Sequence, residues 1–149
     1  MEISLNKKVI VISGGTKGVG KQLALQCAAD GAHVVISGRD EASATSIIEA
    51  AKKAPGTIEF KKTDLHSVSS IRELFAYVAD KYSKLDGFVN YAGITPAASL
   101  TECSESLFDD VFDIDIKAAF FCCQETVKLM QKTGGGSIVL VGSTHHTRG

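Results

Sequence analysis

Residues 9–20 read VIVISGGTKGVG, and this stretch decides the fold of the chain. Its first four residues, Val9 to Ile12, are apolar and β-branched, which is typical of a strand buried on both faces of a parallel sheet. Glycines follow at positions 14, 15, 18 and 20, and the segment from Lys21 to Asp30 favours a helix. The stretch therefore predicts a strand, a glycine-rich turn and a helix in succession.

The glycine-rich turn has the properties of a phosphate-binding site. Because glycine lacks a Cβ atom, the backbone can take positive φ angles and approach a ligand closely. The free N–H groups and the dipole at the start of the following helix attract negative charge. The turn is therefore a candidate nucleotide-binding loop, and the alternative is a tight connection between two apolar segments.

The spacing of the glycines separates the kinds of nucleotide site. Gly14, Gly18 and Gly20 give G-x-x-x-G-x-G, which differs from the dinucleotide fingerprint G-x-G-x-x-G. The segment from Gly15 to Lys21 matches the start of an NTPase phosphate loop. That motif then needs a Ser or Thr hydroxyl for Mg²⁺, where this chain has Gln22, so an NTPase is disfavoured.

Length and composition describe an ordinary globular domain. The 149 residues are 44% hydrophobic and 22% charged, enough for one hydrophobic core. Sixteen basic and seventeen acidic residues give a net charge of -1 without a basic cluster, which disfavours nucleic acid as a partner. No segment approaches the about 18 apolar residues of a membrane span, and the N-terminus lacks a signal-peptide pattern. We therefore expect a cytoplasmic protein with no membrane partner.

The four cysteines, at positions 27, 103, 122 and 123, form no C-x-x-C pair. Cys122 and Cys123 are about 100° apart on a helix, so they cannot both bind one metal ion. We expect reduced thiols packed in the protein interior and no metal site.

Strands and helices alternate along the rest of the chain. Apolar residues at helical spacing predict helices around residues 44–51, 71–78 and 104–132, with Ser67 to Ser70 at the start of the second and a capping box of Ser70 and Glu73. The expected strands are His33–Ser37, Thr57–Lys62 nearer an edge, Phe88 and Val89 leading to Asn90, and Ser137–Val141. This alternation predicts a parallel sheet with helices on both faces.

The expected helix over residues 112–132 is apolar on nearly all sides. One face carries Phe112, Ile116, Ala119, Cys123, Val127 and Met130, and much of the rest carries Ile114, Ala118, Phe121, Cys122 and Leu129. Such a helix needs to be buried on two sides, one of them against the sheet. The second cover could be a partner subunit or another part of the same fold, and composition leaves both alternatives open.

Four segments resemble the short-chain dehydrogenase/reductase family. Ser13–Gly20 resembles the cofactor loop of this family, and Thr63-Asp64-Leu65 resembles its adenine contact. Asn90-Tyr91-Ala92-Gly93 resembles the N-N-A-G motif, and residues 136–143 resemble the strand that leads to the active-site Ser. Ser13 replaces the usual Thr, and Tyr91 replaces the second Asn. All four segments lie at the carboxyl ends of expected strands, where cofactor pockets occur. The resemblance implies an α/β fold with a Rossmann-type doubly wound parallel sheet, of which this chain holds about five of seven strands.

The resemblance implies a cofactor site and part of a catalytic site. The implied cofactor-binding residues are Gly14, Thr16, Lys17, Gly18, Val19, Gly20, Arg39, Asp64, Leu65, Asn90, Ala92 and Gly93. Ser143 matches the Ser that holds the substrate oxygen, and Asp115 stands where the family usually has a water-holding Asn. The structural alternatives are that Asp64 caps a helix, Asn90 ties strand ends together and Ser143 belongs to a turn.

Charge favours NADP(H) over NAD(H) as the cofactor. NAD-binding members carry an acidic residue at the end of the second strand, where this chain has Gly38 and Arg39. An Arg can bind the 2′-phosphate with two hydrogen bonds, and Lys17 adds a second positive charge nearby. Asp40 is the counter-argument because it could pair with Arg39, so NAD(H) stays possible.

The resemblance implies hydride transfer between a nicotinamide cofactor and a carbonyl compound or secondary alcohol. The given residues supply only part of the catalytic site for this reaction. A catalytic Tyr is expected about a dozen residues after Ser143, with a Lys four residues later. Residues 144–149 contain neither, and Tyr77, Tyr82 and Tyr91 lie on other elements. His145 and His146 are interpreted as loop histidines rather than metal ligands.

We therefore expect residues 1–149 to be a dinucleotide-binding domain that stops in the active-site loop and is inactive alone. The parent protein would be an NADP(H)-dependent oxidoreductase acting on a small carbonyl compound or alcohol. The family resemblance implies a homodimer or homotetramer when the protein is complete. The alternative is a non-catalytic NADP(H)-binding fragment or interaction module. Such a chain would expose its last strand and one side of its long helix.

Overall fold

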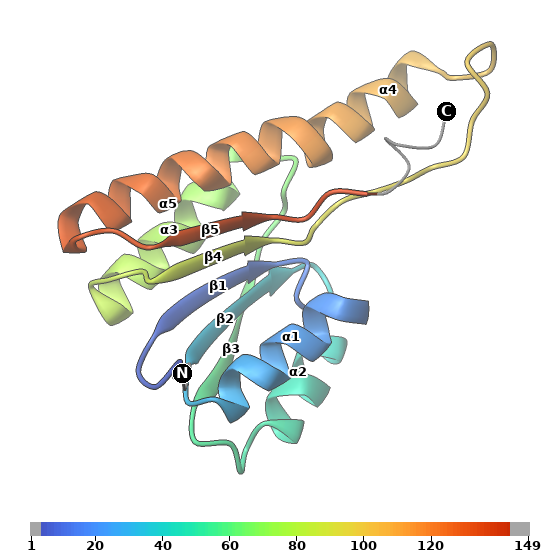
Figure 1. Cartoon of the computed structure of the whole chain (residues 1–149). Helices are drawn as coiled ribbons and strands as arrows, with labels where there is room; N and C mark the ends of the chain where they lie inside the picture. Colours follow the sequence, from blue (N-terminus) through green and yellow to red (C-terminus); the bar gives the residue numbers. More distant parts are fainter. Residues whose placement is uncertain (1–3, 144–149) are drawn as a thin grey trace.

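The computed structural model describes residues 4–143, which form one five-stranded sheet in the order β3-β2-β1-β4-β5. The strands are β1 (Val9–Ser13), β2 (His33–Gly38), β3 (Thr57–Lys62), β4 (Gly87–Asn90) and β5 (Ser137–Leu140). All neighbouring strands pair in parallel. The predicted α/β fold with a doubly wound parallel sheet is confirmed, including the edge position of β3 (Figure 1).

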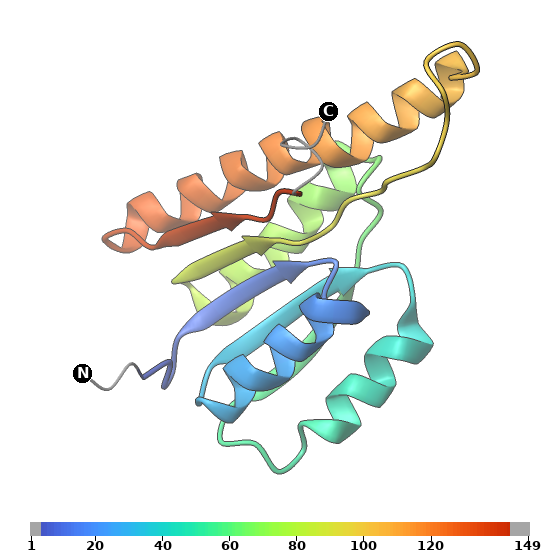
Figure 2. The ribbon, with the colours of Figure 1, turned by 45° about the vertical axis from the view of Figure 1, so that its right-hand side comes forward.

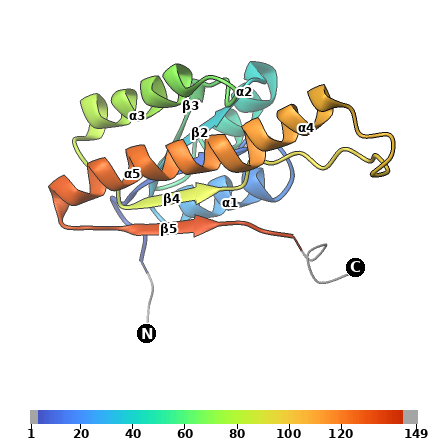
Figure 3. The same cartoon turned by 90° about the horizontal axis from the view of Figure 1, so that it is seen from above.

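The helices are α1 (Gly18–Ala29), α2 (Glu41–Ala50), α3 (Val68–Tyr82), α4 (Glu105–Val111) and α5 (Ala119–Thr133). Between α4 and α5 the chain continues as a π-helix, η1 (Phe112–Ala118), so that α4, η1 and α5 form one long helix. This long helix runs beside β4 and β5, and its α4 end extends past the strands (Figures 2 and 3). Within the described part of the chain, no helix is long and apolar enough to cross a membrane.

Alternate residues of β1 contribute to two separate hydrophobic cores. Val9 and Val11 belong to a core with α3 and the long helix, which includes Leu74, Phe88 and Cys122. Ile10 and Ile12 belong to the other core, with side chains from α1 and α2. Successive side chains of a strand point to opposite faces, so the run of four apolar residues reflects burial on both faces.

One predicted helix start and one predicted capping box differ from the structure. Helix α1 begins at Gly18 rather than Lys21. Helix α3 is capped by Ser67, whose hydroxyl accepts a hydrogen bond from the Ser70 N–H at 3.3 Å, so the predicted capping box of Ser70 and Glu73 is wrong. Ser67 has the extended backbone that an N-cap requires, whereas Ser70 already lies inside the helix.

The long helix is buried on one side only, and the face predicted from α-helical spacing is divided between exposed residues and the buried Met130. Phe112, Ile116 and Val127 are exposed, while Ile114, Ala118, Cys122 and Met130 are buried. A π-helical turn holds more residues than an α-helical turn, so a stripe drawn at α-helical spacing does not follow one face through η1. The structure buries one side of this helix and leaves the other exposed.

The cysteines occupy three kinds of environment. Cys27 and Cys122 are buried, Cys123 is half-buried, and Cys103 is exposed in the segment between β4 and α4. All four thiols are free. Burial raises the pKa of Cys122 to about 12. The expectation of packed thiols is therefore wrong for Cys103, because a polar, irregular segment surrounds it.

Candidate functional site

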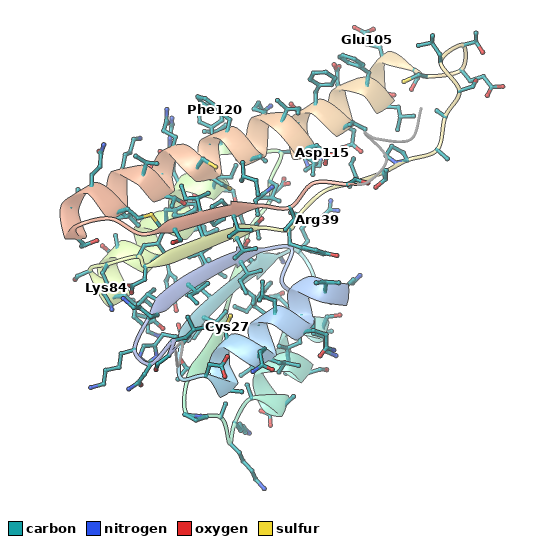
Figure 4. The ribbon with its side chains drawn as sticks, viewed as in Figure 1. Cys27, Arg39, Lys84, Glu105, Asp115 and Phe120 are labelled. Atoms are coloured by element: carbon teal, nitrogen blue, oxygen red, sulfur yellow. The ribbon has the colours of Figure 1, made fainter. Side chains whose placement is uncertain are left out.

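A cleft of about 470 Å³ lies at the carboxyl ends of β1 to β4. Its walls come from the turns that follow these strands, together with Asp110 and Ile114 of the long helix. Successive strands are added to one side of β1 up to β3 and to its other side from β4 onward, and doubly wound sheets bind their ligands where the strand order reverses in this way. Figure 4 shows Arg39 and Asp115 at this end of the sheet and Lys84 at the opposite end.

Close packing explains two of the glycines in the turn after β1. Gly14 has a φ of 72°, and a Cβ atom there would lie 2.8 Å from the backbone nitrogen of Ala92. A Cβ atom at Gly20 would lie 2.4 Å from the Gly14 carbonyl oxygen. These glycines therefore let the turn, the start of α1 and the segment after β4 pack closely beside the cleft.

The start of α1 lies next to the cleft and carries no side-chain cap. Its N-cap residue, Lys17, makes no side-chain capping hydrogen bond, and the first turn holds no acidic residue. Lys17 and Gly18 both line the cleft. Since the first N–H groups of a helix lack partners within the helix, this end suits a phosphate group.

Two basic residues, Lys17 of the turn after β1 and Arg39 just after β2, line the same part of the cleft. Lys17 Nζ is 3.4 Å from Asp40 Oδ2, and both groups are exposed to solvent. Asp40 caps α2 by accepting hydrogen bonds from the backbone N–H and the hydroxyl of Ser43. The Ser43 N–H and then its hydroxyl are the main causes that lower the pKa of Asp40 to about 2.

The pairing of Asp40 with Arg39, which would have weakened the argument for NADP(H), is absent. Within residues 4–143, Arg39 makes no ion pair, and its side chain is exposed at the cleft. The guanidinium is therefore accessible to an anionic group.

The end of β3 contributes a carboxylate that is tied to a histidine. Asp64 Oδ1 accepts a hydrogen bond from the His66 backbone N–H at 3.1 Å and lies 3.1 Å from His66 Nδ1. The N–H and the ring of His66 lower the pKa of Asp64. The other ring nitrogen, Nε2, lies 2.5 Å from Asp110 Oδ1 of α4. His66 and Asp110 were not predicted, and only the position of His66 directly after the Thr63-Asp64-Leu65 segment could have indicated it.

Asn90 ties two strand ends together, as one of its two interpretations expects. Its buried side-chain oxygen Oδ1 accepts a hydrogen bond from the Ser13 hydroxyl at 2.7 Å. The same hydroxyl accepts a longer hydrogen bond, of 3.4 Å, from the Ala92 N–H. Asn90 therefore fixes the shape of the cleft floor without lining the cleft.

Asp115 joins the long helix to the segment after β4. Its Oδ1 accepts a hydrogen bond from the Ile94 N–H at 2.9 Å. A Cβ atom at Gly93 would lie 3.3 Å from the same oxygen, so the contact is close. The residue is part of η1, and π-helical turns often occur at functional sites.

Nine of the predicted cofactor residues line the cleft: Gly14, Thr16, Lys17, Gly18, Arg39, Asp64, Leu65, Ala92 and Gly93. The remaining predicted site residues, Val19, Gly20, Asn90, Asp115 and Ser143, do not line it. Ser143 is exposed just after β5. His145 and His146 lie outside the described residues. Over residues 4–143, no three His, Cys, Asp or Glu side chains are placed to hold a metal ion.

The sheet and the cleft define a Rossmann-like α/β protein. A family model described as short chain dehydrogenase matches residues 8–149. The chain therefore belongs to the short-chain dehydrogenase/reductase family, whose members are oxidoreductases that bind NAD(P)(H).

Similar proteins support this assignment. The chain is 39% identical over 145 residues to a 3beta-hydroxysteroid dehydrogenase of Mediterraneibacter gnavus, covering 97% of this chain and 52% of the relative. It is 32% identical over 141 residues to an L-rhamnose 1-dehydrogenase (NAD(P)(+)) of Azotobacter vinelandii, covering 91% and 55%. The chain thus spans about half the length of these curated relatives.

A solved structure shows the same fold. The short-chain dehydrogenase/reductase from Serratia marcescens BCRC 10948 superimposes with a TM-score of 0.91 at 24% sequence identity. The match covers 99% of this chain and 60% of that structure.

Proposed function

We propose that the protein containing this chain is an NADP(H)-dependent oxidoreductase. It transfers a hydride between the nicotinamide and the carbon of a small carbonyl compound or secondary alcohol. Residues 1–149 supply its dinucleotide-binding domain. The observation that carries the proposal is the cleft at the β1/β4 reversal, which combines a glycine turn, an uncapped helix start and an accessible guanidinium.

The residues around the cleft fit the parts of this cofactor. The glycine turn and the start of α1 offer N–H groups for the diphosphate. Among residues 4–143, Arg39 offers an unpaired positive charge for the 2′-phosphate, and Lys17 offsets the negative charge of the neighbouring Asp40 carboxylate, which lies 3.4 Å away. Asp64 would accept a hydrogen bond from the adenine amino group. This charge pattern supports NADP(H) over NAD(H).

The chain also contributes groups for the reaction. When bound, the cofactor supplies the hydride acceptor or donor. The Ser143 hydroxyl would donate a hydrogen bond to the substrate oxygen and so polarise the carbonyl group. Asp115 holds the segment after β4 through the Ile94 N–H, and in place of the family Asn it would hold a water molecule for proton transfer.

The exposed side of the long helix supports an assembly of identical subunits. Phe108, Phe112, Ile116 and Phe120 are 48–61% exposed, and Phe120 lies on the side away from the sheet (Figure 4). Apolar surface of this extent indicates a protein interface. A cytoplasmic homodimer or homotetramer acting on a small molecule is the expected working form.

The cofactor preference is tested by replacing Arg39. In the protein that carries this sequence, Arg39→Ala should weaken NADPH binding about tenfold or more, because one charge-assisted hydrogen-bonding group is lost. NADH binding should change less than about twofold, since it has no 2′-phosphate. Binding is measured by nicotinamide fluorescence titration with both cofactors.

The control is Lys53→Ala, which removes the same charge from an exposed residue outside the cleft. It should leave both affinities unchanged. Equal losses for NADPH and NADH in Arg39→Ala would contradict the assigned 2′-phosphate site. Absence of turnover with either cofactor across a panel of ketones would contradict the proposed reaction.

A further inference from the structure

One contact in the cleft is not explained by the fold or by the proposed chemistry. The imidazole of His66 lies between two carboxylates, with Nδ1 3.1 Å from Asp64 Oδ1 and Nε2 2.5 Å from Asp110 Oδ1. Carboxylates only accept hydrogen bonds, and a neutral imidazole has a single N–H. Only the protonated ring can donate to both partners, so this geometry fits an imidazolium.

The bridge connects elements that are distant in sequence. Asp64 follows β3, whereas Asp110 lies in the last turn of α4, and Asp115 lies in η1, which follows α4. All three residues of the bridge line the same cleft. The bridge therefore joins the long helix to the end of the sheet at the wall of the candidate cofactor site.

The bridge also determines which oxygen of Asp64 is free. Oδ1 is occupied by the backbone N–H and the ring of His66. Among residues 4–143, Oδ2 has no hydrogen-bond partner. A ligand amino group in the cleft would therefore be received by Oδ2, while His66 fixes the orientation of the carboxylate.

We propose that protonated His66 is a positioning residue that holds Asp64 and α4 in place for the adenine end of a bound dinucleotide. This inference rests on the proposed function and adds to it a dependence of dinucleotide binding on pH. Loss of the ring proton breaks one of the two bonds of the bridge. Dinucleotide binding should therefore weaken as the pH rises.

The charges around the His66 ring support weaker binding at higher pH. Asp110 from α4 and Asp64 from the end of β3 face the imidazole, and Arg39 from the end of β2 lies near Asp64. Asp110 first and then Asp64 raise the pKa of His66 above its usual value. Because the pKa is raised, the bridge is complete at low pH and is lost as the pH rises through the pKa of the folded protein. By reciprocity, a bound dinucleotide should raise the pKa of His66 further.

The test compares the pH dependence of binding in three variants. Kd for NADH is measured between about pH 6 and pH 9, because NADH lacks the phosphate monoester that titrates near pH 6 in NADPH. In the unaltered protein, Kd should increase about threefold to tenfold over this range, as for one partly exposed charge-assisted bond. His66→Gln has no titrating ring and should give a flat profile with weak binding throughout.

Asp110→Asn gives a different signature. Its amide can donate to the unprotonated ring nitrogen, so the bridge survives loss of the proton. Binding should then stay tight at all pH values. The matched control is Asp109→Asn, which makes the same change one residue earlier on α4, outside the cleft. It should keep the profile of the unaltered protein.

The outcomes separate this inference from the proposed function. If His66→Gln keeps the original pH profile, or if Asp109→Asn flattens it as Asp110→Asn does, His66 has no positioning role. If His66→Gln does not fold, Asp110→Asn decides, because a retained pH dependence there overturns the inference. If the unaltered protein binds neither NADH nor NADPH at any pH, the proposed function itself is wrong.

Discussion

Strands β2 and β5 have similar sequences and very different surroundings. Both contain a short run of branched apolar residues, in HVVISG and SIVL respectively. In β2, Val34, Val35 and Ile36 are fully buried, whereas in β5 Val139 and Leu140 are 50% and 58% exposed. Strand β2 lies inside the sheet between β1 and β3, and β5 lies at the opposite edge.

This difference shows what an apolar strand pattern does and does not predict. The pattern indicates a strand, but burial depends on the neighbours that pack against it. Side chains of α1 and α2 pack on β2 and complete a hydrophobic core, and the turn after β1 lines the cleft beside it. We infer that this half of the molecule carries most of the stability of residues 4–143 and that β5 adds little.

Matched substitutions in the two strands should give the largest contrast. Ile36→Ala removes a fully buried side chain and should lower the free energy of unfolding by about 2–5 kcal/mol. Ile138→Ala removes a side chain that is 36% exposed and should cost less than about 1 kcal/mol. Urea denaturation of both variants measures the contrast. Equal losses would show that β5 is as important to stability as β2.

A second contrast compares a glycine in the turn after β1 with a glycine in the segment that directly follows β5. Gly14→Ala combines a positive φ with a backbone contact at 2.8 Å, so we expect a loss of about 2–3 kcal/mol. Gly142→Ala meets no atom of residues 4–143 within 4 Å and should change stability by less than about 0.5 kcal/mol. Thermal unfolding gives both values, and NADPH titration should show lost binding for Gly14→Ala only. Unchanged NADPH binding in Gly14→Ala would separate the close packing from the cofactor site.

The smallest loss of stability is expected at Asp86, which precedes β4 and contacts the start of β1. Its carboxylate accepts hydrogen bonds from the Val9 N–H and the Lys8 ammonium and forms an ion pair with Lys84. Burial acts to raise the pKa of Asp86, but the Val9 N–H and the two ammonium groups outweigh it and lower the pKa to about 2. The carboxylate therefore stabilises the fold at neutral pH, and this contribution is lost as the pH falls from about 4 to 2.

Asp86→Asn should cost about 1–2 kcal/mol at neutral pH, and the difference from the unaltered protein should shrink at about pH 2. Guanidinium denaturation at the two pH values provides the measurement. Asp80→Asn on the exposed side of α3 serves as the control and should have little effect at either pH. A cost for Asp86→Asn that does not change with pH would exclude the charge as its cause.

Sequence reasoning succeeded where the determining interactions are local. The run Val9 to Ile12 and the glycines after it encode a buried strand and a tight turn, because strand pattern and turn chemistry act over a few residues. Most of the predicted cofactor residues line the cleft for the same reason, since they directly follow strands.

The remaining features depend on contacts between distant segments. His66 and Asp110 are 44 residues apart and meet only because α4 lies beside the end of β3. The grouping of residues into faces of the long helix used α-helical spacing, which η1 interrupts, and residues 112–118 give no local signal of the π-helix. The cap at Ser67 lies within the predicted capping segment Ser67 to Ser70, but several serines compete there, and the capping box was assigned to Ser70 instead.

The uneven environments of the cysteines have a practical consequence. Burial raises the pKa of Cys27, Cys122 and Cys123, which leaves less of the reactive thiolate at neutral pH, whereas Cys103 is exposed. A maleimide dye should therefore attach first to Cys103, without any engineered cysteine. The dye would sit on the segment that leads from the cleft into α4, and its fluorescence would report movement there when a dinucleotide binds.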